Sequence, residues 1–418
     1  MDIQIIADTA LNAGAQVLIN GGETYRAEET MSFIAQALGA ENISSFVTPT
    51  IVMISCTSQA GVRNTSIKRI KRRETNLNRL SLVNDFSRKI SSKQLLGSEA
   101  ITGIKEISES PGYSAYAVIF FAAVSAFCFS LMFKGCLKEA LISFVLGAIM
   151  KSCLFFAAPL ALPEFMLCIL GAAITSTLSG VAVALGLVQG FGNINIAVLM
   201  ALVPGVAIVN AIRDCIAGDF MAGNARILEA FMIAAGLSIG ASVGLLLFPI
   251  SGGYQSALLI WEDPLPAFCL SAIAVAAFSY LFNVSKKDIP WAALIGGAGW
   301  VIYIILRNDY VSAISAYIIG AFIIGLISEI FAVALKRPAT VFIIPGIIPF
   351  VPGGGMYETM LYAVLNNQKD FTSTGFATLL GAGGIALGIA LASVFARLYS
   401  KIRKQYKRWF YRSSSGSS

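Results

Sequence analysis

Charged side chains within long apolar segments are the residues of this sequence most able to do chemistry. Lys151 and Glu329 each lie inside an apolar run, and Arg213 and Asp214 follow the end of another. A charge in lipid is costly, so such residues usually face a cavity, a partner or a transport pathway. We expect these four to serve as proton carriers or counter-charges. The plainer alternatives are that Lys151 and Glu329 extend to a membrane interface, and that Arg213 and Asp214 form a salt-bridged cytosolic loop.

Two segments rich in proline and glycine interrupt the apolar runs. The first contains Pro204-Gly205, and the second extends from Ile344 to Gly355. Proline removes a backbone donor and glycine permits an abrupt change in φ, so neither segment is expected to form a regular helix. Unwound backbone at membrane depth survives beside a cavity, where free N–H groups can bind a substrate carboxylate. The alternative is a kink or re-entrant turn without a ligand. The expected substrate-binding residues are Pro204, Gly205, Asn210, Pro345, Gly346, Pro349, Pro352 and Gly353.

Several kinds of catalytic or metal site are disfavoured by composition. The chain has no histidine, and its 7 cysteines are scattered without a C-x-x-C spacing. Zinc, haem and histidine-based acid–base chemistry are therefore not expected, and we predict no metal, no cofactor and no catalytic residue. An alternative is a membrane-tethered hydrolase with a hydroxyl nucleophile activated by Glu23, Glu28 or a lysine. Its candidate nucleophiles are Thr24, Ser45, Thr48 and Thr50.

Composition indicates the elements that must position these residues. The chain is 56% hydrophobic and 13% charged with a mean hydropathy of +0.76, whereas soluble proteins carry about 25% charged residues. We predict a polytopic α-helical membrane protein, because a helix of about 20 apolar residues crosses a bilayer. About ten spans are expected, at Tyr113–Phe133, Glu139–Ala158, Glu164–Val188, Ile194–Ile212, Ile227–Pro249, Leu265–Phe282, Ile289–Leu306, Val311–Leu335, Thr340–Val364 and Thr372–Leu398.

The charges divide the chain into parts. Residues 1–112 hold 12 Lys/Arg and 11 Asp/Glu, which favours a small cytosolic α/β domain, and the start of the chain lacks the basic region of a signal peptide. Residues 113–250 and 264–400 are expected to form two membrane repeats, and 401–418 a basic tail whose serine-rich end is either a cloning remnant or disordered. Basic connections place both termini in the cytosol. Lys134 and Lys138 do not fit that orientation, whereas Glu262-Asp263 fits it as an outer loop.

The two membrane parts match at a constant offset. Lys138-Glu139 corresponds to Lys287-Asp288, since 287 − 138 = 149, and the same offset relates Gly147 to Gly296 and Gly171 to Gly320. Units of five spans would place the second copy upside down relative to the first. Such inverted repeats are a common architecture of secondary transporters. Chance matching of small residues is the alternative.

Helical periodicity within the N-terminal part predicts helices at Ile3–Ile19, Thr24–Leu38, Asn76–Ile90 and Leu95–Ile107, with strands at Ser45–Cys56 and Arg63–Ile70. The basic run at 68–73 is expected to face anionic lipid or solvent rather than nucleic acid.

The sequence resembles the threonine/serine exporter family over nearly its whole length. In the N-terminal part the resemblance rests on Gly22-Glu23-Thr24-Tyr25-Arg26-Ala27-Glu28-Glu29-Thr30-Met31 and on Thr48-Pro49-Thr50. The membrane part contributes Pro204-Gly205, Asn210 to Asp214, Gly218-Asp219, Gly223, Arg226, Glu329, Arg337-Pro338, Pro345-Gly346, Pro349, Val351-Pro352-Gly353 and Tyr357. This resemblance adds Tyr357 to the expected substrate-binding residues.

The resemblance implies export of threonine and serine driven by the proton motive force, from the cytosol across the cell (inner or plasma) membrane. Some related two-chain members are similar but associated with a dicarboxylate such as succinate, so a dicarboxylate exporter is one alternative. A passive channel is another alternative. The expected partners are the solute, protons and the lipid bilayer, and a homo-oligomer is left open.

Overall fold

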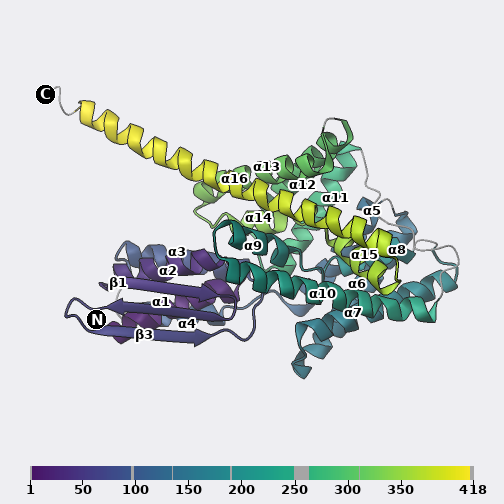
Figure 1. Cartoon of the computed structure of the whole chain (residues 1–418), viewed down its shortest axis with the longest axis horizontal. Coiled ribbons are helices and arrows are strands. Elements are labelled where there is room, and N and C mark those ends of the chain that lie inside the picture. Colours follow the sequence, from purple (N-terminus) through teal and green to yellow (C-terminus); the bar gives the residue numbers. More distant parts are fainter. Residues whose placement is uncertain are drawn as a thin grey trace.

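The computed structural model describes residues 2–95, 98–133, 135–188, 191–248, 263–309 and 311–414. The protein is mostly helical, with a small sheet at its N-terminal end and a long C-terminal helix that extends past it (Figure 1). Lys134, Glu262, the end of the expected span at Pro249 and the last residues of the serine-rich end lie outside the described residues.

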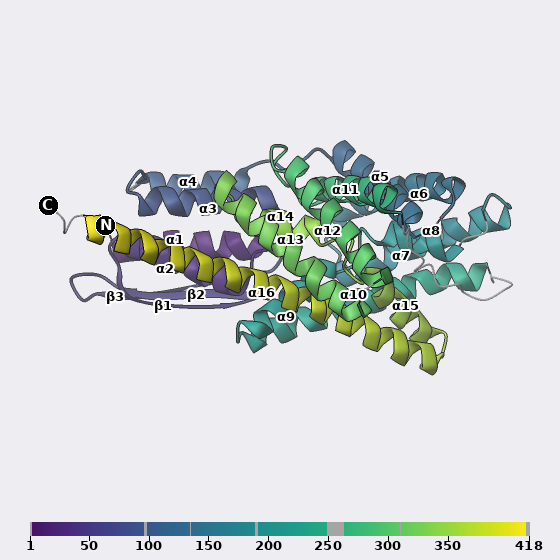
Figure 2. The ribbon, with the colours of Figure 1, turned by 90° about the horizontal axis from the view of Figure 1, so that it is seen from above.

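The N-terminal part has three layers. A three-stranded antiparallel sheet of β1 (Glu41–Thr48), β2 (Ile51–Thr57) and β3 (Arg63–Arg69) is covered on one face by α1 (Ile3–Ile19) and α2 (Thr24–Ala37). Helices α3 (Leu77–Ser91) and α4 (Ser98–Glu109) form the third layer (Figure 2). Only alternate residues of β2, namely Val52, Ile54 and Cys56, are buried, because successive side chains of a strand point to opposite faces.

One expected strand is in fact a hairpin. We predicted a single strand over Ser45–Cys56, but the chain turns at Pro49-Thr50 so that β1 and β2 pair with each other. Proline has no N–H to give to a strand ladder, which favours a turn there. Thr48 stabilises the turn, since its Oγ1 accepts a hydrogen bond from the Ile51 N–H at 3.1 Å.

Eight described helices are long and apolar enough to cross a membrane. Eight of the ten expected spans are thus continuous helices. The fourth span of each half, expected at Ile194–Ile212 and Thr340–Val364 with a break in each, is divided into two short helices. The first pair is α8 (Phe191–Leu199) and α9 (Gly205–Ile216), and the second is α14 (Thr340–Gly346) and α15 (Gly353–Val364). The long helices are α5 (Ala115–Met132), α6 (Leu137–Ala157), α7 (Glu164–Ala184), α10 (Phe220–Leu247), α11 (Pro264–Leu281), α12 (Ile289–Asp309), α13 (Ala313–Leu335) and α16 (Gln368–Ser414).

The two halves repeat the same packing. Helix α7 packs on α10 as α13 packs on α16, and α5 on α6 as α11 on α12. The close approaches repeat in detail. Gly240 of α10 lies against the Ile169 carbonyl and Ala172, whereas Gly388 of α16 lies against the Ile318 carbonyl and Ala321. These partners are related by the offset seen in the sequence, because 318 − 169 and 321 − 172 both equal 149. The halves therefore share one scaffold.

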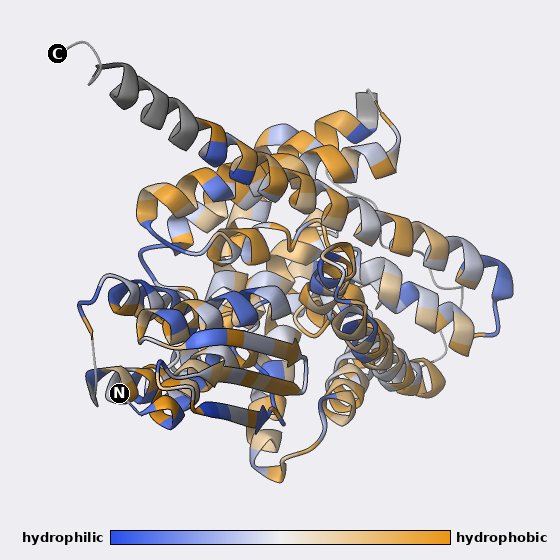
Figure 3. Ribbon diagram, turned by 60° about the vertical axis from the view of Figure 1, so that its left-hand side comes forward, coloured by the Kyte–Doolittle hydropathy of each residue, from blue (hydrophilic) through white to orange (hydrophobic). Residues whose placement is uncertain are grey.

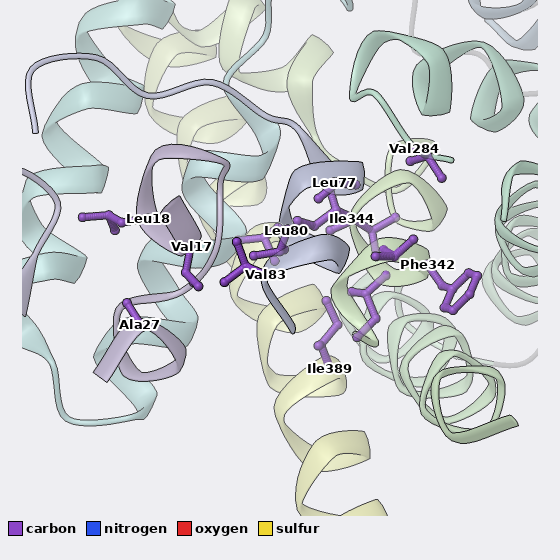
Figure 4. Packing of buried hydrophobic residues seen from close by; sticks show 14 of the residues in the cluster. Val17, Leu18, Ala27, Leu77, Leu80, Val83, Val284, Phe342, Ile344 and Ile389 are labelled. Carbon is purple, nitrogen blue, oxygen red and sulfur yellow. The ribbon is translucent and has the colours of Figure 1, made fainter. Parts of the chain in front are cut away.

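The N-terminal part and the membrane helices share a hydrophobic core. Figure 4 shows Leu77 and Leu80 of α3 beside Ile344 of α14, with Ile389 of α16 close by. The backbone N–H of Leu77 also donates to the Phe282 carbonyl, at 2.9 Å. Each fully buried aliphatic side chain contributes about 1.5–3 kcal/mol, so this joint is a substantial packed interface. Hydrophobic residues are concentrated on the long helices, and many hydrophilic ones lie in the N-terminal part (Figure 3).

Candidate functional site

The two breaks in the interrupted helices cross each other. Each has the sequence Val-Pro-Gly, at Val203–Gly205 and Val351–Gly353, and the copies are separated by 148 residues (353 − 205). Gly205 lies against the side chain of Val351, and Gly353 lies against the side chain of Val203. A Cβ at either glycine would overlap its neighbour, so only glycine permits this approach. The reciprocal contact is what two related segments make when each packs on the other.

Two helix N-termini begin at this crossing. Pro204 precedes the first turn of α9 and Pro352 that of α15. The first N–H of each helix, at Gly205 and Gly353, donates to the carbonyl of Val203 and of Val351, respectively. The N–H groups that follow in the first turn have no partner within the helix and carry partial positive charge. The crossing therefore combines two backbone arrangements suited to a carboxylate.

Buried polar side chains surround these helices. The Asn195 side chain of α8 donates from Nδ2 to the Tyr357 hydroxyl of α15 at 2.7 Å, and the Ser238 hydroxyl donates to the Tyr357 carbonyl at 3.3 Å. Among the described residues, neither Asn195 Oδ1 nor Asn210 Nδ2 has a hydrogen-bond partner, although both atoms are buried. Buried polar atoms are ordinarily paired, so these two fit a bound solute or water.

Sequence reasoning missed three of the residues near this centre: Asn195, Ser238 and Glu358. Glu358 is 1% exposed and occupies the position of α15 that Asn210, 2% exposed, occupies in α9, since 358 − 210 = 148. The internal repeat could have identified Glu358, because aligning the two Val-Pro-Gly segments pairs it with Asn210.

The remaining expected residues of the second break serve packing. Pro345 and Gly346 are in the last turn of α14, and Pro349 lies in the turn that follows. Gly346 is so close to Gly296 of α12 that a Cβ on Gly296 would lie 3.1 Å from the Gly346 Cα. All three residues are buried. Gly346 brings α14 against α12, whereas Pro352, Gly353 and Tyr357 lie at the crossing or contact residues beside it.

A second polar cluster joins the N-terminal part to the first half. Arg213 Nη1 lies 2.6 Å from Glu23 Oε1, and Arg226 Nε lies 3.0 Å from Asp214 Oδ2. The Thr24 hydroxyl donates to Asp214 Oδ1 at 3.2 Å. Glu23 and Asp214 are both 0% exposed. Burial alone would raise the pKa of the Glu23 carboxyl, but Arg213 and, more weakly, Arg26 hold that pKa below its ordinary value.

Three of the four expected charged residues meet at this cluster or at its edge. Arg213 and Asp214 belong to it, and their partners come from the N-terminal part and α10 rather than from a local loop. Glu329 of α13 is half-buried, accepts a hydrogen bond from the Ser393 hydroxyl at 3.4 Å and interacts electrostatically with Arg26 and Arg213. Lys151 is elsewhere, half-buried on α6.

Two of the four candidate hydroxyl nucleophiles make structural contacts. Thr24 donates to Asp214 and Thr48 stabilises the hairpin turn, while Glu28 accepts a hydrogen bond from the Val47 N–H at 3.0 Å. In the part of the chain that the structure describes, no group of three His, Cys, Asp or Glu side chains is placed to hold a metal ion.

Comparison with known families matches nearly the whole chain. The family model described as "Putative threonine/serine exporter" matches residues 8–248, and the one described as "Threonine/Serine exporter, ThrE" matches 267–395. No solved structure matches.

Three curated relatives illustrate the similarity. The "Threonine/serine exporter" of Corynebacterium glutamicum is 24% identical over 78% of this chain and 68% of its own length. The "Probable threonine/serine exporter" of Mycobacterium tuberculosis is 22% identical over 93% of this chain and 76% of its own length. The "Uncharacterized protein C7D4.12c" of Schizosaccharomyces pombe is 24% identical over 90% of this chain, which spans about half of that relative (52%).

Proposed function

This chain belongs to the threonine/serine exporter family, and on that premise we propose that it exports threonine and serine from the cytosol, driven by protons. It is a multi-pass membrane protein. Under this proposal it lies in the cell (plasma or inner) membrane with both termini in the cytosol.

The crossing of the two Val-Pro-Gly breaks is the observation that carries the proposal. Two helix N-termini begin there, and the adjoining helices α8 and α9 carry the buried amide side chains of Asn195 and Asn210, each with an unpaired atom. The backbone N–H groups of α9 and α15 would bind the solute carboxylate. Asn210 Nδ2 would donate to a carboxylate or hydroxyl, and Asn195 Oδ1 would accept from the ammonium or hydroxyl.

The shared scaffold supports alternating access. The two halves repeat each other's packing and meet at the crossing, so rocking one half against the other would open the central site first to one side and then to the other. We also propose that the two halves have opposite orientations in the bilayer.

Proton coupling needs a carboxyl group that changes its charge during the cycle. Glu358 is a candidate beside the crossing, and Glu329 and Asp214 are candidates near the N-terminal part. Asp214 pairs with Arg226 and accepts a hydrogen bond from Thr24. It could therefore take up or release a proton only if these contacts opened. Arg213 is the counter-charge of Glu23. Lys151 of α6 is a second proposed counter-charge.

Counterflow in proteoliposomes tests the function. Labelled threonine, serine and succinate would each be measured with and without an imposed pH gradient. We expect threonine and serine to exchange and to accumulate against their gradient when protons flow the other way. Exchange of succinate alone would overturn the proposal, and accumulation that an uncoupler leaves unchanged would overturn the proton coupling.

Glutamine substitutions then separate the proton carriers. Glu358→Gln, Glu329→Gln and Asp214→Asn would each be tested for counterflow, which needs no net proton movement, and for pH-driven accumulation. The proton carrier is the residue whose substitution retains counterflow and loses accumulation. If all three variants accumulate solute normally, none of these carboxyl groups carries the proton.

A further inference from the structure

A cavity lies in the N-terminal part, away from the crossing. It is formed between α2 and α3, which contact each other. Its volume is about 330 Å³, at the lower end of the range of small-molecule sites, roughly 300–1,000 Å³. The lining residues are Arg26, Glu29, Thr30, Phe33, Asn84, Ser87, Arg88 and Ser91.

The lining has charges of both signs. Arg26 and Arg88 provide guanidinium donors, which match a carboxylate well, and Glu29 provides an acceptor for an ammonium group. Asn84 and Ser87 add groups that can bond a hydroxyl. This combination is complementary to a small zwitterion, whereas a dianion would meet the carboxylate of Glu29.

Both arginines are already held in place. Arg26 Nη1 donates to the Thr340 hydroxyl at 3.2 Å, and Arg88 Nη2 donates to the Lys336 carbonyl at 2.6 Å and pairs with Asp85. A guanidinium has five N–H donors, so each retains donors for a ligand. Anchoring reduces the entropy that binding would cost.

These anchors connect the cavity to the transport machinery. Lys336 and Thr340 bound the connection between α13 and α14, and α14 leads directly into the second Val-Pro-Gly break. Arg26 also interacts electrostatically with Glu23 of the buried cluster. A ligand that engages the two guanidinium groups would therefore act on the segments that position both breaks.

We propose that this cavity binds a small zwitterionic amino acid, with its carboxylate between Arg26 and Arg88 and its ammonium group at Glu29, and that binding there raises the export rate. The site rests on the lining residues alone. Its role as an activator rests on the proposed function, because the ligand is then of the same class as the exported solute. The protein would respond to the cytosolic concentration of that solute before transporting it.

Direct binding tests the site. Binding of labelled serine to the full-length protein in nanodiscs would be compared between wild type, Arg88→Ala and Lys89→Ala. Arg88 is exposed, so its replacement leaves the core intact, and Lys89 is its exposed neighbour outside this cavity. We expect a second equivalent of bound serine in wild type and Lys89→Ala. Arg88→Ala should bind it about tenfold to a hundredfold more weakly, from loss of a charge-assisted hydrogen bond. Identical binding by all three proteins would overturn the site.

Transport kinetics test the activation. In wild type, the export rate should rise more steeply than hyperbolically with internal serine, and Arg88→Ala should make the dependence hyperbolic. A hyperbolic wild-type curve would overturn the activating role. Binding lost in Arg88→Ala, together with no transport of serine by wild type, would retain the site and overturn the proposed function instead.

Discussion

The two interrupted helices have the same framework and different chemistry. Both break at Val-Pro-Gly, and both breaks pack on each other. Helix α9, however, carries Asn210 and, toward its C-terminal end, Arg213-Asp214, which the N-terminal part and α10 hold by buried ion pairs. Helix α15 carries Glu358 at the matching position and ends at Val364, which is exposed. In Figure 1, α9 lies toward the N-terminal part and α15 away from it.

This difference indicates that the two interrupted helices share a structural role at the crossing and differ in the role of their side chains. The framework needs two matching breaks, because each glycine makes room for the valine of the other. The side chains are free to differ, so one helix can be fastened to the N-terminal part while the other supplies a buried carboxyl group. In the first half the N-terminal part is held by buried ion pairs. In the second half it is held by apolar packing of α3 on α14 together with the partly exposed ion pair between Arg337 and Asp85, at 3.3 Å.

The largest effect should come from removing one partner of the buried ion pair between Arg213 and Glu23. Arg213→Ala leaves the carboxylate of Glu23 buried without its 2.6 Å partner, which should destabilise the protein by about 3–5 kcal/mol. The double variant Arg213→Ala with Glu23→Gln should recover part of this loss. Apparent melting temperature in detergent measures both. An unchanged melting temperature in Arg213→Ala would show that the first half is not fastened by this pair.

The crossing should give the next largest effect, and it should be alike in both halves. Gly205→Ala and Gly353→Ala each place a Cβ against a valine, at a cost of about 1–3 kcal/mol for overpacking. Counterflow should fall in both. Gly383→Ala is the matched control, because nothing lies within 4 Å of its added Cβ.

Rescue tests whether the glycines act through these valines. Val351→Ala should restore Gly205→Ala, and Val203→Ala should restore Gly353→Ala. Exchanging the rescuing substitutions should restore neither variant. Rescue by either valine substitution alike would contradict the reciprocal packing.

A smaller effect is expected from removing one hydrogen bond between the halves. Tyr357→Phe removes the hydroxyl that accepts from Asn195 at 2.7 Å, which should cost about 0.5–1.5 kcal/mol. Counterflow should show a raised KM with exchange retained. A similar result from Tyr362→Phe, on the same helix, would mean that the effect is not specific to this bond.

The smallest effect is the pH dependence of the stability that the ion pair between Glu23 and Arg213 contributes. The folded-state pKa of Glu23 lies below its ordinary value of 4.5, so its ion pair contributes stability above that pH. This contribution is lost as pH falls below 4.5 through the folded-state pKa. Glu23→Gln should therefore flatten the acid side of a plot of melting temperature against pH. An equal acid loss in wild type and variant would assign it to other carboxyl groups.

Much of the framework could be predicted from the sequence. Apolar length identified eight continuous spans, and the proline and glycine content of Pro204-Gly205 and of Ile344–Gly355 indicated where two more would break, because proline and glycine act on the local backbone. The hairpin turn at Pro49 was missed, although the same local reasoning would have found it. The partners of Arg213 and Asp214 could not be found this way, since Glu23 is distant in sequence.

The sequence by itself determined that this chain is a membrane protein whose apolar runs are interrupted twice by proline and glycine, and it indicated that the two halves are related. These properties follow from transfer of apolar side chains into lipid and from backbone geometry, which depend on neighbouring residues. Only the tertiary structure decided that the breaks cross, that Asn195 meets Tyr357, and that Glu23 and Thr24 are buried against the first half. Such contacts join residues more than a hundred positions apart, and no local pattern encodes which of them will meet.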